Sequence, residues 1–196
     1  MNSNKPTDNR AWEMAREFLL RQRHMAPDGP THLSEEVVLL RQRLILEELG
    51  ELAIAIHQQD RVEVADACCD LAYVLHGTAV AMGCPTLSYF EGRAPQYRTD
   101  LLIETAKACV RVVETCRTTD DWTVEVINAA LQSVSRLAAF YSIPFEACFK
   151  EVHASNMSKD APSEYKPGEK YGSKTAKGEG YRAPQLKEIL DTKGAW

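Results

Sequence analysis

The stretch RVEVADACCDLAYVLHGTAVAMG, residues 61–83, is apolar on nearly every side of a helical projection. A helix of that composition is typical of the middle of a bundle, where every face is covered. Along the rest of the chain, apolar residues recur at helical spacing, and alternating strand-like patterns with paired turn signals are absent from the sequence. The sequence therefore predicts an all-α protein, a helical bundle around a four-helix core.

Turn and cap residues divide the chain into helices. Proline and glycine at 27–30 mark the first connection, and Ser34 before two glutamates is a typical helix start. We expect one domain over 1–196, in which residues 1–9 are disordered and the Gly-, Pro-, Lys- and Tyr-rich stretch 160–196 forms a long loop. The expected helices are 10–24, 34–58, 61–83, 99–117, 121–141 and 144–158, with a short one near 185–190.

A faint internal repeat suggests two copies of a helical hairpin. The segments GCPTLSYF (83–90) and SIPFEACF (142–149) each follow an apolar helix, and LILEE (44–48) aligns with LIETA (102–106). The second copy keeps few acidic residues. We therefore expect the first hairpin to hold the chemistry and the second to supply packing, with chance similarity as the alternative.

Composition argues against several classes of protein. The 196 residues, 44% hydrophobic and 26% charged, are typical of a globular domain with a substantial core. A net charge of −5 disfavours nucleic-acid binding. The polar start lacks a secretory signal, and the longest apolar run, 71–84, is too short for a membrane span, so we expect a cytoplasmic protein with no membrane partner. The six cysteines form no Cys-x-x-Cys pair and are typical of reduced core residues.

The helix expected at 34–58 carries three carboxylates among leucines. In LILEELGEL (44–52), Glu47 and Glu51 lie one helical turn apart, and Glu48 flanks them. Like charges at this spacing destabilise even an exposed helix by a few tenths of a kcal/mol. A solvated acidic face on an ordinary helical interaction protein is the structural alternative.

The next helix makes a metal site the stronger interpretation. Asp66 and Asp70 are also one turn apart, inside an apolar stretch where aspartate, a poor helix former, has little structural reason to occur. The turn HQQDR at 57–61 folds the chain back, so both acidic sets can face each other. Four or five carboxylates would then converge.

Such a cluster needs compensating positive charge. Burying ionised carboxylates costs several kcal/mol each, and we judge Arg41, Arg43 and Arg61 too few and too peripheral to neutralise them. Divalent cations would do so, and carboxylate oxygens favour Mg²⁺ or Mn²⁺ over zinc. A di-iron bundle would require Glu-x-x-His motifs, which the sequence lacks.

Two groups of motifs resemble the all-α nucleoside triphosphate pyrophosphohydrolases. This is the MazG-like superfamily, which includes dimeric dUTPases, and the similarity is closest to its phosphoribosyl-ATP pyrophosphohydrolase-like group. In the helix pair the motifs are EELGE (47–51), DACCDLAYV (66–74) and GTAVAMG (77–83). In the C-terminal part they are SNMSK (155–159) and KGEGYRAP (177–184).

The resemblance implies Mg²⁺-dependent hydrolysis of a (deoxy)nucleoside triphosphate to the monophosphate and pyrophosphate, in sanitation of the nucleotide pool. It also implies a homodimer or higher homo-oligomer, and it makes the tail 160–196 a nucleotide-binding segment that can close as a lid. A catalytically silent nucleotide-binding or regulatory module on the same fold is the alternative.

The resemblance also assigns roles to residues. The expected metal ligands are Glu47, Glu48, Glu51 and Asp70, with Asp66 as a further ligand or second-shell acceptor. One glutamate, Glu48 in preference to Glu47, would orient or deprotonate the attacking water. The expected substrate-binding residues are Asn156, Lys159, Lys177 and Tyr181.

The chain departs from the family pattern at two places. The second motif of the superfamily is Glu-x-x-Asp, and aligning its aspartate on Asp70 puts Ala67 at the glutamate position. Either Asp66 or Glu63 must then join Asp70, and we favour Asp66. Many relatives carry a Phe-His pair near the nucleobase in the first helix, where this chain has phenylalanine and leucine at 18–19.

Overall fold

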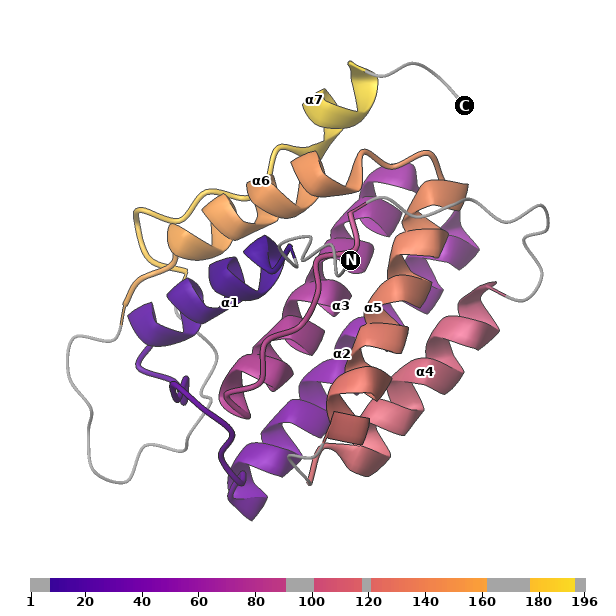
Figure 1. The fold of residues 1–196 in the computed structure, drawn as a ribbon. Coiled ribbons are helices and arrows are strands. Elements are labelled where there is room, and N and C mark those ends of the chain that lie inside the picture. The colour runs from indigo at the N-terminus through magenta and orange to yellow at the C-terminus, as the bar shows by residue number, and fades with distance from the viewer. Residues whose placement is uncertain (1–7, 91–100, 118–120, 162–176, 193–196) are drawn as a thin grey trace, which may run out of the picture.

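The computed structural model describes residues 8–90, 101–117, 121–161 and 177–192, and every regular element in these ranges is an α-helix (Figure 1). All the helices expected from the sequence are present, so the all-α prediction is confirmed. They are α1 (Arg10–Arg21), α2 (Glu35–Gln58), α3 (Arg61–Ala81), α4 (Leu101–Thr115), α5 (Asp121–Phe140), α6 (Phe145–Met157) and α7 (Leu186–Asp191).

Four helices form the core of the bundle. α2 and α3 pack as one hairpin and α4 and α5 as a second, with α3 against α5 and α2 against α4. α1, α6 and α7 pack on α3, which is therefore the central helix (Figure 1). By length and composition α3 would also be able to cross a membrane, but 83% of its most apolar window is buried in the bundle, as expected of a core helix.

A tight connection folds α3 back along α2. α2 ends at Gln58, and Gln59 adopts a left-handed conformation with φ of 59°. The Asp60 carboxylate then accepts hydrogen bonds from the backbone N–H groups of Val62 and Glu63, at 2.9 and 3.2 Å, and caps α3. The two helices therefore run antiparallel, with their acidic residues on neighbouring turns.

α1, α3, α4, α5 and α6 end one to three residues earlier than predicted, and in two of these helices a left-handed backbone conformation is the reason. α1 stops at Arg21 instead of residue 24, because Arg23 takes a left-handed φ of 55°. α3 stops at Ala81 instead of residue 83, where Gly83 has a φ of 70°. Neither conformation continues a right-handed helix.

The chain ends fall only partly within the described residues. Of the N-terminal segment expected to be disordered, residues 1–7 lie outside them, while the carbonyl of Asp8 accepts a hydrogen bond of 2.7 Å from the N–H of Ser88. Of the C-terminal loop, residues 162–176 lie outside them. Beyond that stretch, α7 forms where a short helix was predicted near 185–190. It buries two leucines against the core.

The two hairpins suggested by the internal repeat are present, but their proline segments differ. Residues 83–90, all of them described, form no helix. In the corresponding segment 142–149, Pro144 immediately precedes α6. The likeness of the two segments in sequence therefore does not extend to their local structure.

The buried polar and sulfur-containing residues behave as core residues. All six cysteines are described, buried and without a disulfide. His76 is buried with its Nδ1 2.8 Å from Thr86 Oγ1, and desolvation lowers its pKa to about 3. Both sets are buried, as the sequence predicts for core residues.

Replacing Gly83 by alanine should destabilise the fold. An added Cβ would lie 2.0 Å from the backbone oxygen of Gly29, at a φ of +70° that disfavours a side chain. We expect the free energy of unfolding, measured by urea denaturation, to fall by about 2 kcal/mol or more. Gly50→Ala is the control, since a Cβ there meets nothing within 4 Å, and it should raise stability by up to about 1 kcal/mol. Equal stability of the two variants would contradict this account.

Candidate active site

A cavity of about 340 Å³ follows the groove between α2 and α3 and reaches α1 and the C-terminal segment. Six of the predicted site residues line it. The charged lining residues are Arg41, Arg43, Glu47, Glu48, Asp70, Lys159 and Lys177. The other lining residues are Phe18, Leu19, His24, Leu40, Leu44, Tyr73, Val74, Gly77 and Asn156.

Three predicted residues lie beside the cavity instead of in its lining. Glu51 is exposed and Asp66 is half-buried, and the charges of both raise the pKa of Asp70. Tyr181 places its ring 4.8 Å from the Nζ of Lys177, in a cation–π contact. Glu51 and Asp66 therefore influence the cavity through their effect on the pKa of Asp70, and Tyr181 through its contact with Lys177.

Burial and mutual repulsion favour the protonated form of the carboxyl groups. Desolvation first, and the charges of acidic neighbours second, raise the pKa of Glu48 from 4.5 to about 8. Burial likewise raises the pKa of both Asp66 and Asp70. The neighbours acting on Glu48 are Asp70, Glu51, Glu47 and Asp66.

The electrostatic interactions along α3 bear on whether Asp66 or Glu63 is the partner of Asp70. Glu63 is exposed in the first turn of α3 and acts on Asp66. Asp66 is the second cause, after desolvation, of the raised pKa of Asp70. This arrangement favours Asp66 as the partner of Asp70.

The donor set suits a hard divalent cation, although the side chains would have to turn toward one another to hold it. Among the described residues, no three His, Cys, Asp or Glu side chains stand in an arrangement that could hold a metal ion. The Oε2 of Glu48, however, is buried without a hydrogen-bond partner among those residues. An orphaned carboxylate oxygen beside further carboxylates fits an oxygen-coordinated ion such as Mg²⁺.

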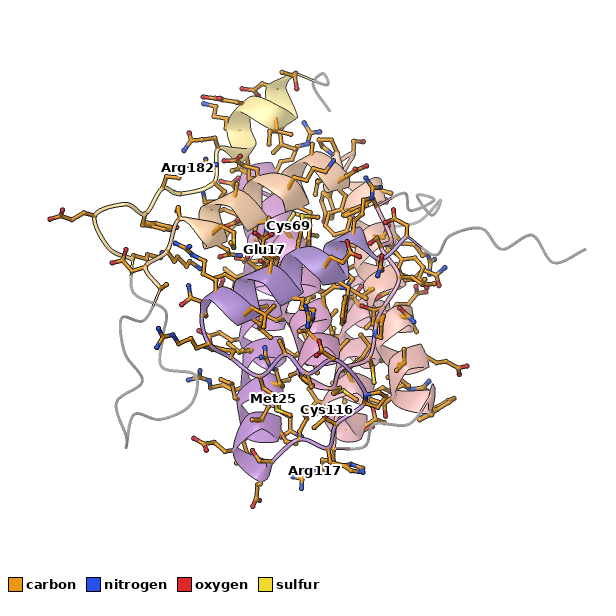
Figure 2. All side chains as sticks on the ribbon, turned by 60° about the vertical axis from the view of Figure 1, so that its left-hand side comes forward. Glu17, Met25, Cys69, Cys116, Arg117 and Arg182 are labelled. Carbon is orange, nitrogen blue, oxygen red and sulfur yellow. The ribbon has the colours of Figure 1, made fainter. Side chains whose placement is uncertain are left out.

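The C-terminal segment is fixed to α6 by hydrogen bonds. Ser155 Oγ donates to the Arg182 carbonyl at 2.8 Å, and the Arg182 N–H donates to Ser158 Oγ at 3.0 Å. The Arg182 guanidinium pairs with Glu151 at 2.5 Å, and Figure 2 shows Arg182 where this segment passes α6. These bonds hold the segment so that Lys177 reaches the cavity.

Two lysines oppose the acidic groups. Both Lys159 and Lys177 lower the pKa of Asp70, against the effect of burial. Lys159 Nζ donates to Asn156 Oδ1 at 2.6 Å and lies 5.9 Å from the centre of the Phe18 ring. Asn156, Lys159 and Lys177 therefore line the same cavity as Glu47, Glu48 and Asp70.

The structure corrects our assessment of Arg41 as peripheral. Its side chain is buried, with 3% of the residue exposed, and it lines the cavity. Arg41 precedes Glu48 by seven residues, two helical turns, so helical periodicity places both on one face. That spacing was the signal in the sequence that could have identified it.

The aromatic residues of α1 divide between cavity and core. Phe18 and Leu19, at the positions of the Phe-His pair of relatives, both line the cavity. Phe18 packs edge-to-face on Tyr73 with ring centroids 5.8 Å apart. Trp12 instead packs against the hydrophobic core.

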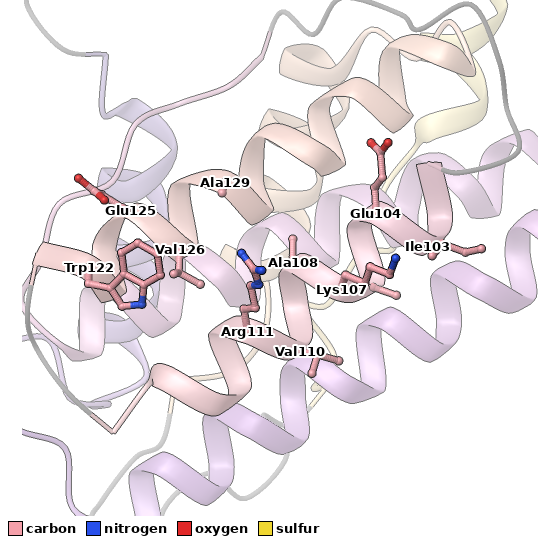
Figure 3. A pocket seen from close by; sticks show the side chains of 11 residues that line it. Ile103, Glu104, Lys107, Ala108, Val110, Arg111, Trp122, Glu125, Val126 and Ala129 are labelled. Atoms are coloured by element: carbon pink, nitrogen blue, oxygen red, sulfur yellow. The ribbon is translucent and has the colours of Figure 1, made fainter.

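A larger groove, about 920 Å³, lies between α4 and α5 but lacks this chemistry (Figure 3). Its lining is largely apolar, with Ile103, Val110 and Trp122 prominent. Its acidic residues, Glu104 and Glu125, are not accompanied by a second acidic pair. We therefore assign the chemistry to the smaller cavity, where charge is concentrated.

Comparison with known proteins identifies the helix pair. Residues 13–91 match the family model described as phosphoribosyl-ATP pyrophosphohydrolase, a segment that contains α2, α3 and all five predicted acidic residues. Comparison with curated proteins and with solved structures gives no match. Residues 13–91 are therefore similar to the phosphoribosyl-ATP pyrophosphohydrolase family, which belongs to the MazG-like all-α superfamily, and this similarity supports a pyrophosphohydrolase activity on nucleotide-like substrates.

Proposed function

We propose that the protein hydrolyses a nucleoside triphosphate to the monophosphate and pyrophosphate in a Mg²⁺-dependent reaction that removes unwanted nucleotides from the pool. The observation that carries the proposal is that acidic residues from α2 and α3 meet two lysines at one half-buried cavity. Carboxylates opposite lysines provide for both a divalent cation and the phosphates it would accompany.

The acidic residues would hold the cation. Mg²⁺, or Mn²⁺ in its place, would be bound by Glu47, Glu48, Glu51 and Asp70, with Asp66 as a further ligand or as a hydrogen-bond acceptor behind them. When bound, the ion neutralises phosphate oxygens and lowers the pKa of a coordinated water.

The remaining steps fall to the protein's own side chains. A water attacks the α-phosphorus, the bond from that phosphorus to the oxygen bridging the β-phosphorus breaks, and pyrophosphate leaves. Glu48, with Glu47 as the alternative, accepts the proton of the attacking water. Lys159 and Lys177 contact phosphate oxygens, and Asn156 orients Lys159 or bonds the sugar.

Changing Asp70 to asparagine should abolish pyrophosphate release. The change removes a cavity carboxylate at nearly constant volume, and we expect kcat/KM to fall at least about 100-fold in an assay of pyrophosphate from a panel of nucleoside triphosphates. Asp66→Asn should reduce activity less. Exposed Glu63→Gln is the matched control on α3 and should retain activity.

The outcomes of that series separate the alternatives. A loss in Glu63→Gln as large as in Asp66→Asn would make Glu63 the partner of Asp70. Saturable, Mg²⁺-dependent nucleotide binding without turnover in the unmodified protein would instead favour a silent nucleotide-binding module.

Changing Glu48 to glutamine should stabilise the protein at pH 8 in the presence of a chelator. Because the folded-state pKa of Glu48 is raised from 4.5 to about 8, the folded state keeps a proton that the unfolded state releases, so stability falls as pH rises through this window. We expect Glu48→Gln to gain on the order of 2 kcal/mol in the free energy of unfolding at pH 8, and little at pH 4. Urea denaturation at both pH values measures this.

The same variant tests cation binding. Mg²⁺ should stabilise the unmodified protein and stabilise Glu48→Gln much less, because a ligand is lost. Glu114→Gln, an exposed change on α4, should follow the unmodified protein in both respects. A stability of Glu48→Gln below that of the unmodified protein at pH 8 would contradict the raised pKa.

We also propose that the protein self-associates through the outer face of α2, α4 and α5. Gln42 Nε2 donates to the carbonyl of Val113 at 2.8 Å and joins α2 to α4. The other helices that the structure describes, α1, α6 and α7, pack mainly on α3 and on one another. Within the described part of the chain, six of the seven large exposed apolar residues lie on these three helices: Leu39, Leu46, Ile54, Ile103, Val110 and Trp122.

The residue pattern of α4 suits a second copy of the chain. In an antiparallel pairing of α4 with its symmetry mate about Lys107, Ile103 of one copy would meet Val110 of the other, and Glu104 would meet Arg111. Such self-complementarity is what a two-fold interface requires. The flexible stem of Lys107 allows its ammonium group to reach solvent at the axis.

Ile103→Glu should shift the oligomer toward monomer, because it buries an unpaired charge in the interface. Sedimentation velocity at micromolar concentration should show a loss of at least about tenfold in association. Leu20→Glu on α1 is a matched control, since Leu20 is 49% exposed and Ile103 52% exposed. Equal effects of both changes, or a monomeric unmodified protein, would rule out this surface.

A further inference from the structure

The cavity has two chemically different ends, set two helical turns apart on the same pair of helices. α2 and α3 run antiparallel, so Glu48 lies beside Asp70 at one level. Seven residues along each helix, Arg41 lies beside Gly77. Seven residues of α-helix rise about 10 Å, a span comparable with the length of a nucleoside. A ligand with its phosphates at the acidic and lysine end would extend toward Arg41.

Gly77 leaves room for Arg41 at its end of the cavity. A Cβ at Gly77 would lie 3.2 Å from Arg41 Nη1 and 3.7 Å from the side chain of Leu19. Arg41 is 3% exposed, so its guanidinium is held among side chains instead of in bulk water. Burial first, and the charge of Arg41 second, lower the pKa of His24 to about 4, and that imidazole is therefore neutral at physiological pH.

Apolar side chains beside Arg41 and along the cavity suit a planar ring. Leu19 lies beside Gly77, and Phe18, Leu40 and Val74 also line the cavity, with the Phe18 ring 5.9 Å from Lys159 Nζ. A guanidinium offers only hydrogen-bond donors, whereas a nucleobase edge offers either carbonyl oxygens or an amino group at its distinguishing position. A guanidinium can therefore donate to a carbonyl edge, whereas an amino group facing it offers no acceptor and places donor against donor.

We propose that Arg41 is a specificity residue that selects nucleobases with a carbonyl at the distinguishing edge, the oxo-bases uracil, thymine, guanine and hypoxanthine, over the amino-bases cytosine and adenine. This inference rests on the proposed function, because it takes the acidic end of the cavity as the phosphate end. Gly77 contributes by leaving the space that the guanidinium needs.

The test compares matched nucleotides that differ at this edge. Pyrophosphate release is measured with dUTP and dCTP, and with dITP and dATP, for the unmodified protein and for Arg41→Gln. We expect the unmodified protein to favour the oxo-base of each pair at least about tenfold in kcat/KM. Arg41→Gln should reduce that ratio to near one, because an amide both donates and accepts. Arg117→Gln, an exposed change past the end of α4, should leave the ratio unchanged.

A second measurement does not depend on turnover. Equilibrium binding of the α,β-imido analogues of dUTP and dCTP, which resist cleavage at the reacting bond, reads the same preference. If no nucleotide releases pyrophosphate but the analogues still bind with the oxo-base preference, the proposed function fails and the inference stands. If pyrophosphate is released without a preference, or Arg41→Gln weakens all nucleotides equally, the inference is overturned and Arg41 is a phosphate-binding or structural residue.

Two further variants guard against loss of folding in Arg41→Gln, which thermal denaturation would reveal. Arg41→Lys keeps the charge and loses the planar fork, so the preference should fall while binding survives. Gly77→Ala places a Cβ against Arg41 Nη1 and should lower the preference through displacement of the guanidinium. An unchanged ratio in both variants would also overturn the inference.

Discussion

The structure depends on holding the carboxylates of two antiparallel helices close together in a half-buried groove. Each carboxylate loses hydration and is repelled by the others, and the pKa of Glu48, raised to about 8, records both effects. Compensation comes from across the cavity, where Lys159 and Lys177 lower the pKa of Asp70. Lys177 belongs to the C-terminal segment that hydrogen bonds hold on α6. Anchoring this segment therefore also keeps a positive charge near the carboxylates of the groove.

The rest of the bundle explains how the fold tolerates this cluster. α3 is buried on most sides and packs on five other helices, so the groove with α2 occupies a small part of its surface. The second hairpin, α4 and α5, has the same two-helix architecture, but its segment LIETA has one glutamate where LILEE has two, and its groove is largely apolar. Repulsion is thus confined to one hairpin, while the other supplies packing that stabilises both.

Helical periodicity predicted the helices and the meeting of the two acidic sets, because both follow from spacing along single helices. It missed features that depend on one backbone conformation or on contacts distant in sequence. The ends of α1 and α3 are set by the left-handed conformations of Arg23 and Gly83. The place of Lys177 was predicted only from the family motif, since it depends on the hydrogen bond of Ser155 with Arg182, 27 residues away. Arg41 was predicted to be peripheral, yet its seven-residue spacing from Glu48 places it on the cavity face of α2, where it is buried.

The two ends of the cavity are carried by the same two helices, and this constrains what the site can accept. A helix fixes the distance between residues seven apart far more firmly than a loop does, so the guanidinium and the carboxylates are held at a set separation. The C-terminal segment, by contrast, is attached through side-chain hydrogen bonds and an exposed ion pair, which are weaker than helix packing. For the nucleotide that we propose as substrate, the wall formed by α2 and α3 would fix the distance from the base to the reacting phosphorus. The anchored C-terminal segment would then supply positive charge to the phosphates.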